Sequence, residues 1–274
     1  MRKKLIMTMT LFAIFLTACG NTGNESEEVV EQENSEQTLQ VAAVESPMTD
    51  VLEIAKDLLA EEDISMEVVE MGDYIQPNEA LENKEIDATF SQHLPFMEQF
   101  NENKGASLTG VQPIYFANFG LYAEDYDSIE DLPDDLSIGI ANDPSNVDRS
   151  LRLLAAHDLI ELNEIDGDQY SLKDIKEDSH NFSFEDAEIS ALSRLYPDVD
   201  SVIMNPTHAS HIDLYPAEDA IITETEDSKF AITLVAREDN ADSELIQKLA
   251  EAMTSEEVRE FLNNREGGAA VPAF

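Results

Sequence analysis

Residues 39–59, LQVAAVESPMTDVLEIAKDLL, contain the pattern that decides the fold of this chain. The first six of them, residues 39–44, form a short apolar run that is typical of a buried strand. After Pro47 the apolar residues fall at positions 51, 52, 54, 55, 58 and 59, which is the spacing of an amphipathic helix. A strand followed directly by a helix predicts one unit of an α/β fold.

The same alternation continues along the chain. Strands are predicted at residues 64–71, 86–90, 114–122, 136–141, 202–205 and 229–236, and helices at 76–81, 94–101, 148–156 and, as one or two helices, 243–262. This order favours the α/β fold class. Because ligands of open α/β sheets bind beyond the carboxyl ends of the strands, functional residues are expected after Val44, Phe90, Ala141 and Asn205.

Composition limits the classes of protein that this chain can belong to. Its 274 residues allow one large domain or two lobes, and a hydrophobic content of 42% is sufficient for a sizeable core. Asp and Glu number 59 against 16 Lys and Arg, which gives a formal net charge of −43. Phosphate backbones repel such a polyanion, so nucleic acid is not an expected partner.

The first residues are predicted to direct export and lipidation. Arg2, Lys3 and Lys4 precede an apolar run at 5–16 that is shorter than a membrane span. The segment 16–20, LTACG, resembles a bacterial lipobox, so residues 1–18 are expected to be a cleaved signal peptide and Cys19 the lipidated residue. The alternative is an ordinary secretory signal with an incidental cysteine.

The residues after Cys19 are expected to hold the folded body at a membrane surface. Residues 19–38 are polar and acidic and are predicted to be a flexible tether. The predicted location is the extracytoplasmic face of the cell membrane, with the protein anchored by lipid. Cys19 is the sole cysteine of the chain, so no thiol is left for a disulfide, a metal or a nucleophile.

Five segments of the body resemble one known family in their order and spacing. They are VAAVESP at 41–47, GDYIQPNEAL at 72–81, DATFSQHLPF at 87–96, NDPSNVDR at 142–149 and GAAVPAF at 268–274. These segments resemble the NlpA-type methionine-binding lipoproteins of bacterial ABC importers, and the resemblance extends over residues 39–274.

The resemblance implies a two-lobed fold of the periplasmic-binding-protein type. Residues 39–120 and 222–274 would form lobe I, residues 121–221 would form lobe II, and hinge strands would cross between them around a ligand cleft. It also implies delivery of methionine, a related amino acid or a short peptide to the permease and ATPase subunits of an ABC transporter. No enzyme activity and no cofactor are expected.

Six residues are expected to bind the ligand, five of them in the matching segments and the sixth, Asn205, after a later strand. Arg149 can hold a carboxylate with two parallel hydrogen bonds, and its alternative role is a surface ion pair. Asn146 lies one turn earlier and would point the same way. The resemblance places Tyr74, His93 and Phe96 in the wall of the side-chain pocket, where aromatic rings suit a thioether. It places Asn205 at the polar end of the ligand.

Three positions depart from the family pattern. Ser91 replaces an aromatic residue, Phe96 replaces a tyrosine, and Ile232 replaces an asparagine that usually contacts the polar end of the ligand. Loss of that amide should cost on the order of 1–3 kcal/mol unless another group replaces it, and Thr233 or His208 are candidates. The resemblance therefore supports the transporter class more strongly than it supports methionine itself.

A metal-capturing lipoprotein, a surface antigen and a hydrolase are the alternatives to transport. His208 and His211 are three residues apart, and together with His93 and some of the many carboxylates they would provide ligands for a zinc-capturing surface lipoprotein. A surface antigen that binds no small ligand is a second alternative. A hydrolase is disfavoured because the sequence contains no Gly-x-Ser-x-Gly motif.

Overall fold

The structure is a computed structural model that describes residues 38–167, 169–177, 180–225 and 228–274. The predicted signal peptide, Cys19 and all of the tether except residue 38 lie outside the described residues. Among the helices of the described residues, none combines the length and the apolar character needed to cross a lipid bilayer.

The first of two large sheets contains six strands in the order β13-β4-β12-β3-β1-β2. Strands β1, β2 and β3 are parallel, whereas β12 runs antiparallel to both β3 and β4. The strands are β1 (Leu39–Ala43), β2 (Met66–Glu70), β3 (Ala88–His93), β4 (Leu108–Phe116), β12 (Ile232–Arg237) and β13 (Val271–Pro272).

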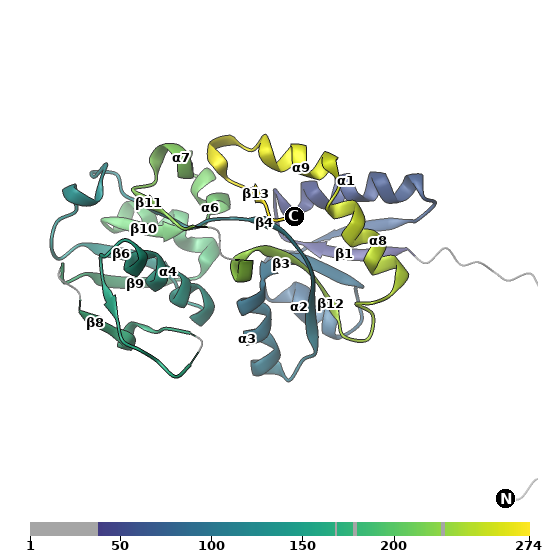
Figure 1. Cartoon of the computed structure of the whole chain (residues 1–274), viewed down its shortest axis with the longest axis horizontal. Helices are drawn as coiled ribbons and strands as arrows, with labels where there is room; N and C mark the ends of the chain where they lie inside the picture. The colour runs from purple at the N-terminus through teal and green to yellow at the C-terminus, as the bar shows by residue number, and fades with distance from the viewer. Residues whose placement is uncertain (1–37, 168, 178–179, 226–227) are drawn as a thin grey trace, which may run out of the picture. The chain divides into compact units, whose positions relative to one another are not determined.

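Helices cover both faces of this sheet (Figure 1). Helices α1 (Met48–Glu61), α8 (Glu244–Met253) and α9 (Glu256–Asn263) pack on one face, and α2 (Gln76–Glu82) and α3 (Leu94–Lys104) pack on the other. Strand β1 shows why. Its residues Val41 and Ala43 point into the core under α1 and α8, and Ala42 points into the core under α2 and α3. Since successive side chains of a strand face opposite ways, a continuous apolar run is buried on both faces.

The second sheet has five strands in the order β11-β5-β10-β6-β9. Helix α4 (Pro144–Ala156) covers one face, and α5 (Leu192–Leu195) and α6 (Pro206–Ser210) cover the other. The strands are β5 (Gly120–Tyr122), β6 (Ser137–Ala141), β9 (Ser183–Ala187), β10 (Ser201–Met204) and β11 (Ile222–Thr223). This region also contains helix α7 (Pro216–Asp219) and a small sheet of β7 (Glu161–Leu162) and β8 (Ile175–Glu177). Its short 3₁₀ turns are η1 (Ile129–Asp131), η2 (Leu172–Asp174), η3 (Ile189–Ala191) and η4 (Tyr196–Asp198).

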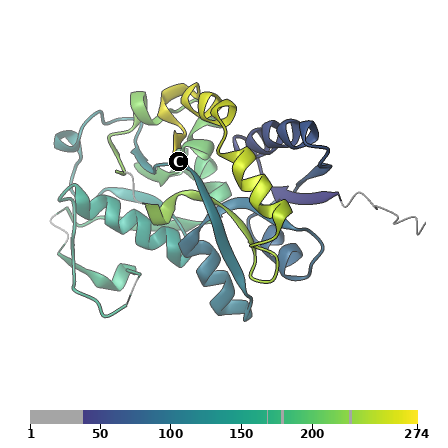
Figure 2. The same cartoon turned by 45° about the vertical axis from the view of Figure 1, so that its right-hand side comes forward.

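Each large sheet with its helices forms a lobe, and the chain passes between the lobes twice. The long strand β4 of the first lobe leads to β5 of the second (Figures 1 and 2), and the chain returns between β11 and β12 through η5 (Ser228–Phe230). Turn η6 (Glu266–Gly268) precedes β13. Gly120 and residues 222–223, which were expected in lobe I, pair instead in the second sheet. The predicted two-lobed α/β fold is confirmed.

The structure differs from the predicted elements in several places, of which four bear on the fold and the pocket. The single strand predicted at 114–122 is two strands, because residues 117–119 cross from one sheet to the other. The strand predicted from residue 229 begins only at Ile232, after a 3₁₀ turn. Strand β3 continues to His93, so residues 91–93 lie in the sheet and not in a loop. Strand β9 was not predicted, because its sequence SFEDA has no apolar period.

Candidate functional site

A pocket lies between the two lobes and contains all eight residues that the sequence indicated. It encloses about 400 Å³ not filled by atoms, part of it open to solvent. The predicted residues that line it are Tyr74, Ser91, His93, Phe96, Asn146, Arg149, Asn205 and Ile232. The sequence analysis missed four further lining residues, Gln92, Ala117, Phe119 and Ile189.

The pocket forms where strands end and helices begin. Strands β3, β6 and β10 each end at the pocket, and the capping residues His93, Asp143 and Asn205 start the next helix. In each helix the capping side chain accepts a backbone N–H from the first turn, and a proline occupies one of the first two positions. This repeated local design fixes the orientation of the side chains at the sheet ends, where α/β proteins bind ligands.

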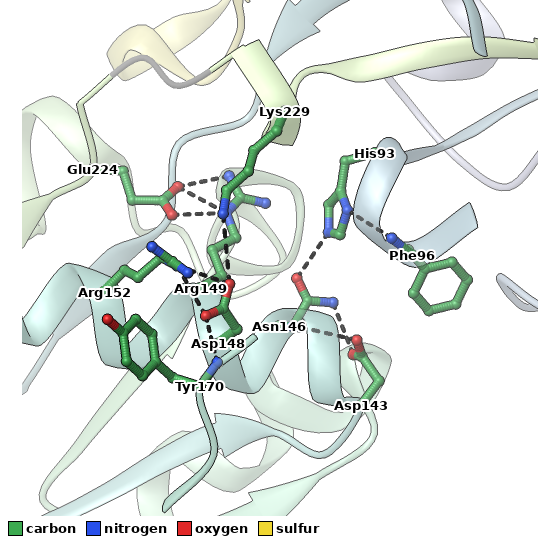
Figure 3. Close-up of polar contacts among 10 residues, drawn as sticks. All are labelled: His93, Phe96, Asp143, Asn146, Asp148, Arg149, Arg152, Tyr170, Glu224 and Lys229. Carbon is green, nitrogen blue, oxygen red and sulfur yellow. Dashed lines mark hydrogen bonds and ion pairs between the residues drawn. The ribbon is translucent and has the colours of Figure 1, made fainter. Parts of the chain in front are cut away.

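A chain of hydrogen bonds joins the two lobes at His93 (Figure 3). The backbone N–H of Phe96 donates to His93 Nδ1 at 3.3 Å, and His93 Nε2 lies 3.1 Å from Asn146 Oδ1. Asn146 Nδ2 in turn donates to Asp143 Oδ2 at 2.8 Å. These partners assign the Nε2–H tautomer, so the ring donates to Asn146 and has no N–H left for a ligand.

The environment of His93 keeps its imidazole neutral. Burial of the ring, followed by the nearby positive charge of Arg149, lowers the pKa of His93 to about 4. A neutral ring suits a position where one nitrogen must accept a backbone N–H. His93 therefore orients Asn146, and its ring lines the pocket. The rings of Phe96 and Phe230 lie edge-on to the His93 ring, with centroid distances of 6.3 and 5.4 Å.

Arg149 is 2% exposed, and most of its guanidinium is already engaged. Its Nε donates to both oxygens of Glu224 at 2.8 and 2.9 Å, and Nη2 donates to Glu224 Oε2 at 2.6 Å and to the carbonyl of Ala117 at 2.8 Å. The rings of Phe119 and Phe230 lie 4.0 and 4.9 Å from the guanidinium carbon. The expected fork of two parallel hydrogen bonds exists, but its acceptor is Glu224.

One edge of Arg149 remains available to the pocket. Nη1 makes no hydrogen bond to any residue that the structure describes, and Arg149 lines the pocket. Glu224 was not predicted, because nothing in the sequence separates it from the other acidic residues among 59. It fixes the guanidinium and offsets its charge, so the site contributes donors with little net charge.

The unpaired polar groups of the pocket are mostly donors. Asn205 uses its Oδ1 to accept from the backbone of His208 at 2.9 Å, which leaves both Nδ2 hydrogens without a partner among the described residues. Asn146 retains one Nδ2 hydrogen. Together with Arg149 Nη1, these groups form a set of donors that suits an anionic oxygen group.

The rest of the pocket is apolar or internally satisfied. Phe96, Phe119, Ile189 and Ile232 contribute hydrocarbon surface. Gln92 is buried and exchanges two hydrogen bonds with Asn78, one of them of 2.7 Å from Asn78 Nδ2, and so requires no ligand. Ser91 and Thr89 share a hydrogen bond of 3.1 Å between their hydroxyl oxygens.

Tyr74 links the pocket to a neighbouring polar group. Its hydroxyl donates to Glu45 Oε1 at 2.8 Å, and burial and the Glu45 charge hold the pKa of Tyr74 well above its usual range. His208 lies edge-on to Tyr74 with 6.2 Å between ring centroids.

An ion pair also crosses between the lobes beside Arg149. Lys229 Nζ lies 3.7 Å from Asp148 Oδ2 of α4. Asp148 is buried and also accepts from Arg152 Nε at 2.9 Å and from the backbone of Tyr170 at 2.8 Å (Figure 3). These contacts hold helix α4, which carries Asn146 and Arg149, against η5, the turn through which the chain returns to the first lobe.

The three histidines considered for zinc do not meet in one place. His93 is engaged by Phe96 and Asn146. His208 and His211 instead face Glu45, and among the described residues these three form the group with the spacing of metal ligands.

Two α/β lobes that surround a pocket with unpaired hydrogen-bond donors and an apolar wall are typical of a two-lobed solute-binding protein. Comparison with known proteins then identifies the family. The NlpA lipoprotein family matches residues 39–274, so this chain belongs to the NlpA lipoprotein family.

Individual relatives agree with this assignment. The methionine-binding lipoprotein MetQ of Bacillus subtilis (strain 168) is 32% identical over 278 residues, which cover 98% of each chain. A nutrient-binding protein from Burkholderia cenocepacia, solved bound to methionine, is 30% identical with a TM-score of 0.82 over 86% of this chain and 100% of its own. A periplasmic substrate-binding protein of an ABC transporter from Coxiella burnetii is 28% identical, with a TM-score of 0.81 over 86% of this chain and 100% of its own. The chain is thus a binding lipoprotein of a non-enzymatic family.

Proposed function

We propose that this lipoprotein captures a free amino acid with an apolar side chain, methionine or a close analogue, and delivers it to an ABC importer. The observation that carries the proposal is the placement of three unpaired donor groups, on Arg149, Asn146 and Asn205, beside an apolar wall in one pocket. A carboxylate would accept from Arg149 Nη1 and the asparagine amides, and the side chain would lie against Phe96, Phe119 and Ile232.

The charge balance of the site favours a zwitterion. Arg149 and Glu224 together carry no net charge, and a free α-amino acid is also neutral overall. A ligand with a second carboxylate would enter a pocket whose one cationic group is already paired, and would lose hydration without full compensation. Glutamate and aspartate are therefore expected to bind much more weakly than methionine.

Pocket size favours a single amino acid over a peptide. The space not filled by atoms is about 400 Å³ and part of it is open to solvent, so little room remains for a second residue. Ile232 removes a polar contact that the family pattern provides, so the affinity for methionine is expected to be lower than an asparagine at this position would give.

The relatives support the transport role. The Bacillus relative is named for methionine binding, and the Coxiella structure is described as part of an ABC transporter. The permease and ATPase would be separate chains, and a lipid at Cys19 would hold the binding protein near them at the membrane surface.

The test is to identify the ligand directly. Mass spectrometry of small molecules released from the purified full-length lipoprotein in detergent is expected to find methionine or an analogue. Calorimetry would then compare L-methionine, D-methionine, methionyl dipeptides and L-glutamate, with L-glutamate as the charge control. Binding of none of the monomeric amino acids, or preference for glutamate, would refute the proposal.

A further inference from the structure

A second polar cluster joins the two lobes next to the pocket. Glu45 follows strand β1 of the first lobe, whereas His208 lies in α6 of the second lobe and His211 follows that helix. Glu45 Oε2 is 3.2 Å from His211 Nε2, and Glu45 Oε1 is 3.8 Å from His208 Nδ1. One ligand-type atom of each residue lies within 4.8 Å of the other two.

His208 is the feature of this cluster that points to a ligand. The residue is 1% exposed, yet neither of its ring nitrogens has a hydrogen-bond partner among the described residues. Its Nδ1 is directed at Glu45, but 3.8 Å is too long for a hydrogen bond. A buried polar side chain without partners is unfavourable and needs an explanation, and a bound ion that uses the free nitrogen is one that the neighbouring Glu45 and His211 support.

We propose that Glu45, His208 and His211 bind a divalent transition-metal ion, with zinc the best match to their chemistry. Two imidazoles and one carboxylate are a recognised ligand set for Zn²⁺ that leaves a fourth position open to water or another ligand. With metal–ligand bonds of about 2.0 Å, tetrahedral ligand atoms lie about 3.3 Å apart. The 3.2 Å between Glu45 Oε2 and His211 Nε2 matches that distance, and His208 Nδ1 lies 3.8 Å from the other oxygen, Oε1, so the three ligands need only a small adjustment to meet one ion.

The surroundings support the three ligands. Tyr74 donates to Glu45 Oε1, the type of outer contact that orients a ligating carboxylate. Asn205 caps the helix that carries His208 by accepting from its backbone N–H at 2.9 Å. Tyr74 and Asn205 also line the amino-acid pocket, so the metal site and the pocket share supporting residues.

The position of the ligands gives the metal a role beyond the site itself. Because Glu45 belongs to one lobe and the histidines to the other, a bound metal ion stabilises the arrangement in which the lobes meet. An amino acid held between the lobes stabilises the same arrangement, so metal and amino acid should each raise the affinity for the other. This coupling, unlike the metal site, rests on the proposed function.

The first experiment tests the metal site with metal alone. The full-length lipoprotein without a histidine tag is treated with a chelator, dialysed and titrated with Zn²⁺ in calorimetry, and Co²⁺ is used to record the absorption of a tetrahedral site. The chain carries 59 acidic residues, so weak binding to surface carboxylates must be separated from the site. Variants provide that separation.

His211→Gln and Glu45→Gln should each weaken Zn²⁺ binding at least tenfold and remove the tetrahedral Co²⁺ absorption. His180→Gln is the matched control, because His180 also lies beside an acid, with Nδ1 3.3 Å from Asp134, but belongs to no three-residue ligand group in the described part of the chain. It should bind Zn²⁺ like the original protein. Equal affinities in all four proteins, or no binding in any, would overturn the site.

The second experiment tests the coupling. L-methionine is titrated with and without saturating Zn²⁺, and a several-fold increase in affinity is expected for the original protein and for His180→Gln, but not for His211→Gln. Metal binding with no change in methionine affinity would overturn the coupling and leave the site standing. If no amino acid binds at all, the proposed function fails, while the metal titration still decides the site.

Discussion

Arg149 and His208 are both buried nitrogen-rich side chains where the two lobes meet, and their neighbours satisfy them very differently. Arg149 donates to Glu224 and Ala117 and lies against the Phe119 ring, so only Nη1 is unpaired among the described residues. His208 is equally buried, but neither of its nitrogens has such a partner. The neighbours of Arg149 fix the geometry of a charged group. The lack of partners at His208 indicates that a bound species can occupy its nitrogens.

The largest effect on binding and stability is expected from removing the hydrogen bonds of Arg149. Arg149→Met should abolish amino-acid binding, with a loss of at least a hundredfold in calorimetry. It should also lower the free energy of unfolding by about 3–5 kcal/mol, because Glu224, whose side chain is 11% exposed, loses its counter-charge. Urea denaturation measures the second effect.

A double variant separates the two roles of the arginine. Arg149→Met with Glu224→Gln removes the unpaired charge, so most of the stability should return while binding stays absent. Retained affinity in the single variant would show that Arg149 is not the anchor of the ligand.

Ile232→Asn should add a hydrogen-bonding group to the pocket and raise the affinity for methionine. Ile232 lines the pocket on β12, and an amide there can meet the polar end of an amino acid. A gained hydrogen bond to a charged group is worth about 1.5–3 kcal/mol, so L-methionine binding should tighten about tenfold or more in calorimetry. Ile232→Val, which changes the volume without adding an amide, should not do so. An unchanged or weaker affinity in Ile232→Asn would mean that no ligand atom lies near this position.

His93→Gln should change the pH dependence of stability. The pKa of His93 is about 4 in the folded chain and about 6.5 when unfolded, so the unfolded state binds an extra proton between these values. The stability from neutral His93 is fully present above pH 6.5 and decreases as the pH falls toward 4, by at most about 1.4 kcal/mol per pH unit. Urea unfolding from pH 7 to 5 should show a smaller decrease in His93→Gln. Identical slopes would contradict the buried neutral ring.

His208→Leu is the counterpart of the arginine variant and should have the smallest effect. In chelator-treated protein no hydrogen bond is lost, so the free energy of unfolding should stay within about 1 kcal/mol of the original or increase. The same urea measurement applies. A loss of more than about 2 kcal/mol would show that His208 has a structural partner, and the contrast with Arg149 would disappear.

Local pattern was sufficient for much of the fold. The alternation of apolar runs and amphipathic segments predicted the α/β class, and most strands and helices begin within a few residues of the predicted positions. It failed where the strand 114–122 divides between two sheets, because each half is equally apolar and nothing local marks the crossing. The resemblance of the motif segments, and not periodicity, indicated the two lobes.

The candidate site shows the same division. The resemblance to the family identified eight residues that line the pocket, and six of them lie at or after the ends of β3, β6 and β10, where a capping side chain starts the next helix. The sequence could not indicate that Glu224 would pair with Arg149, which lies 75 residues earlier, or that Glu45 would meet His208 and His211. Short-range preferences act within a few residues, whereas these pairs exist only because two lobes bring distant segments of the chain together. The sequence by itself determined the class of fold and the pocket residues, and the tertiary structure decided which charges are paired and which nitrogens are left free.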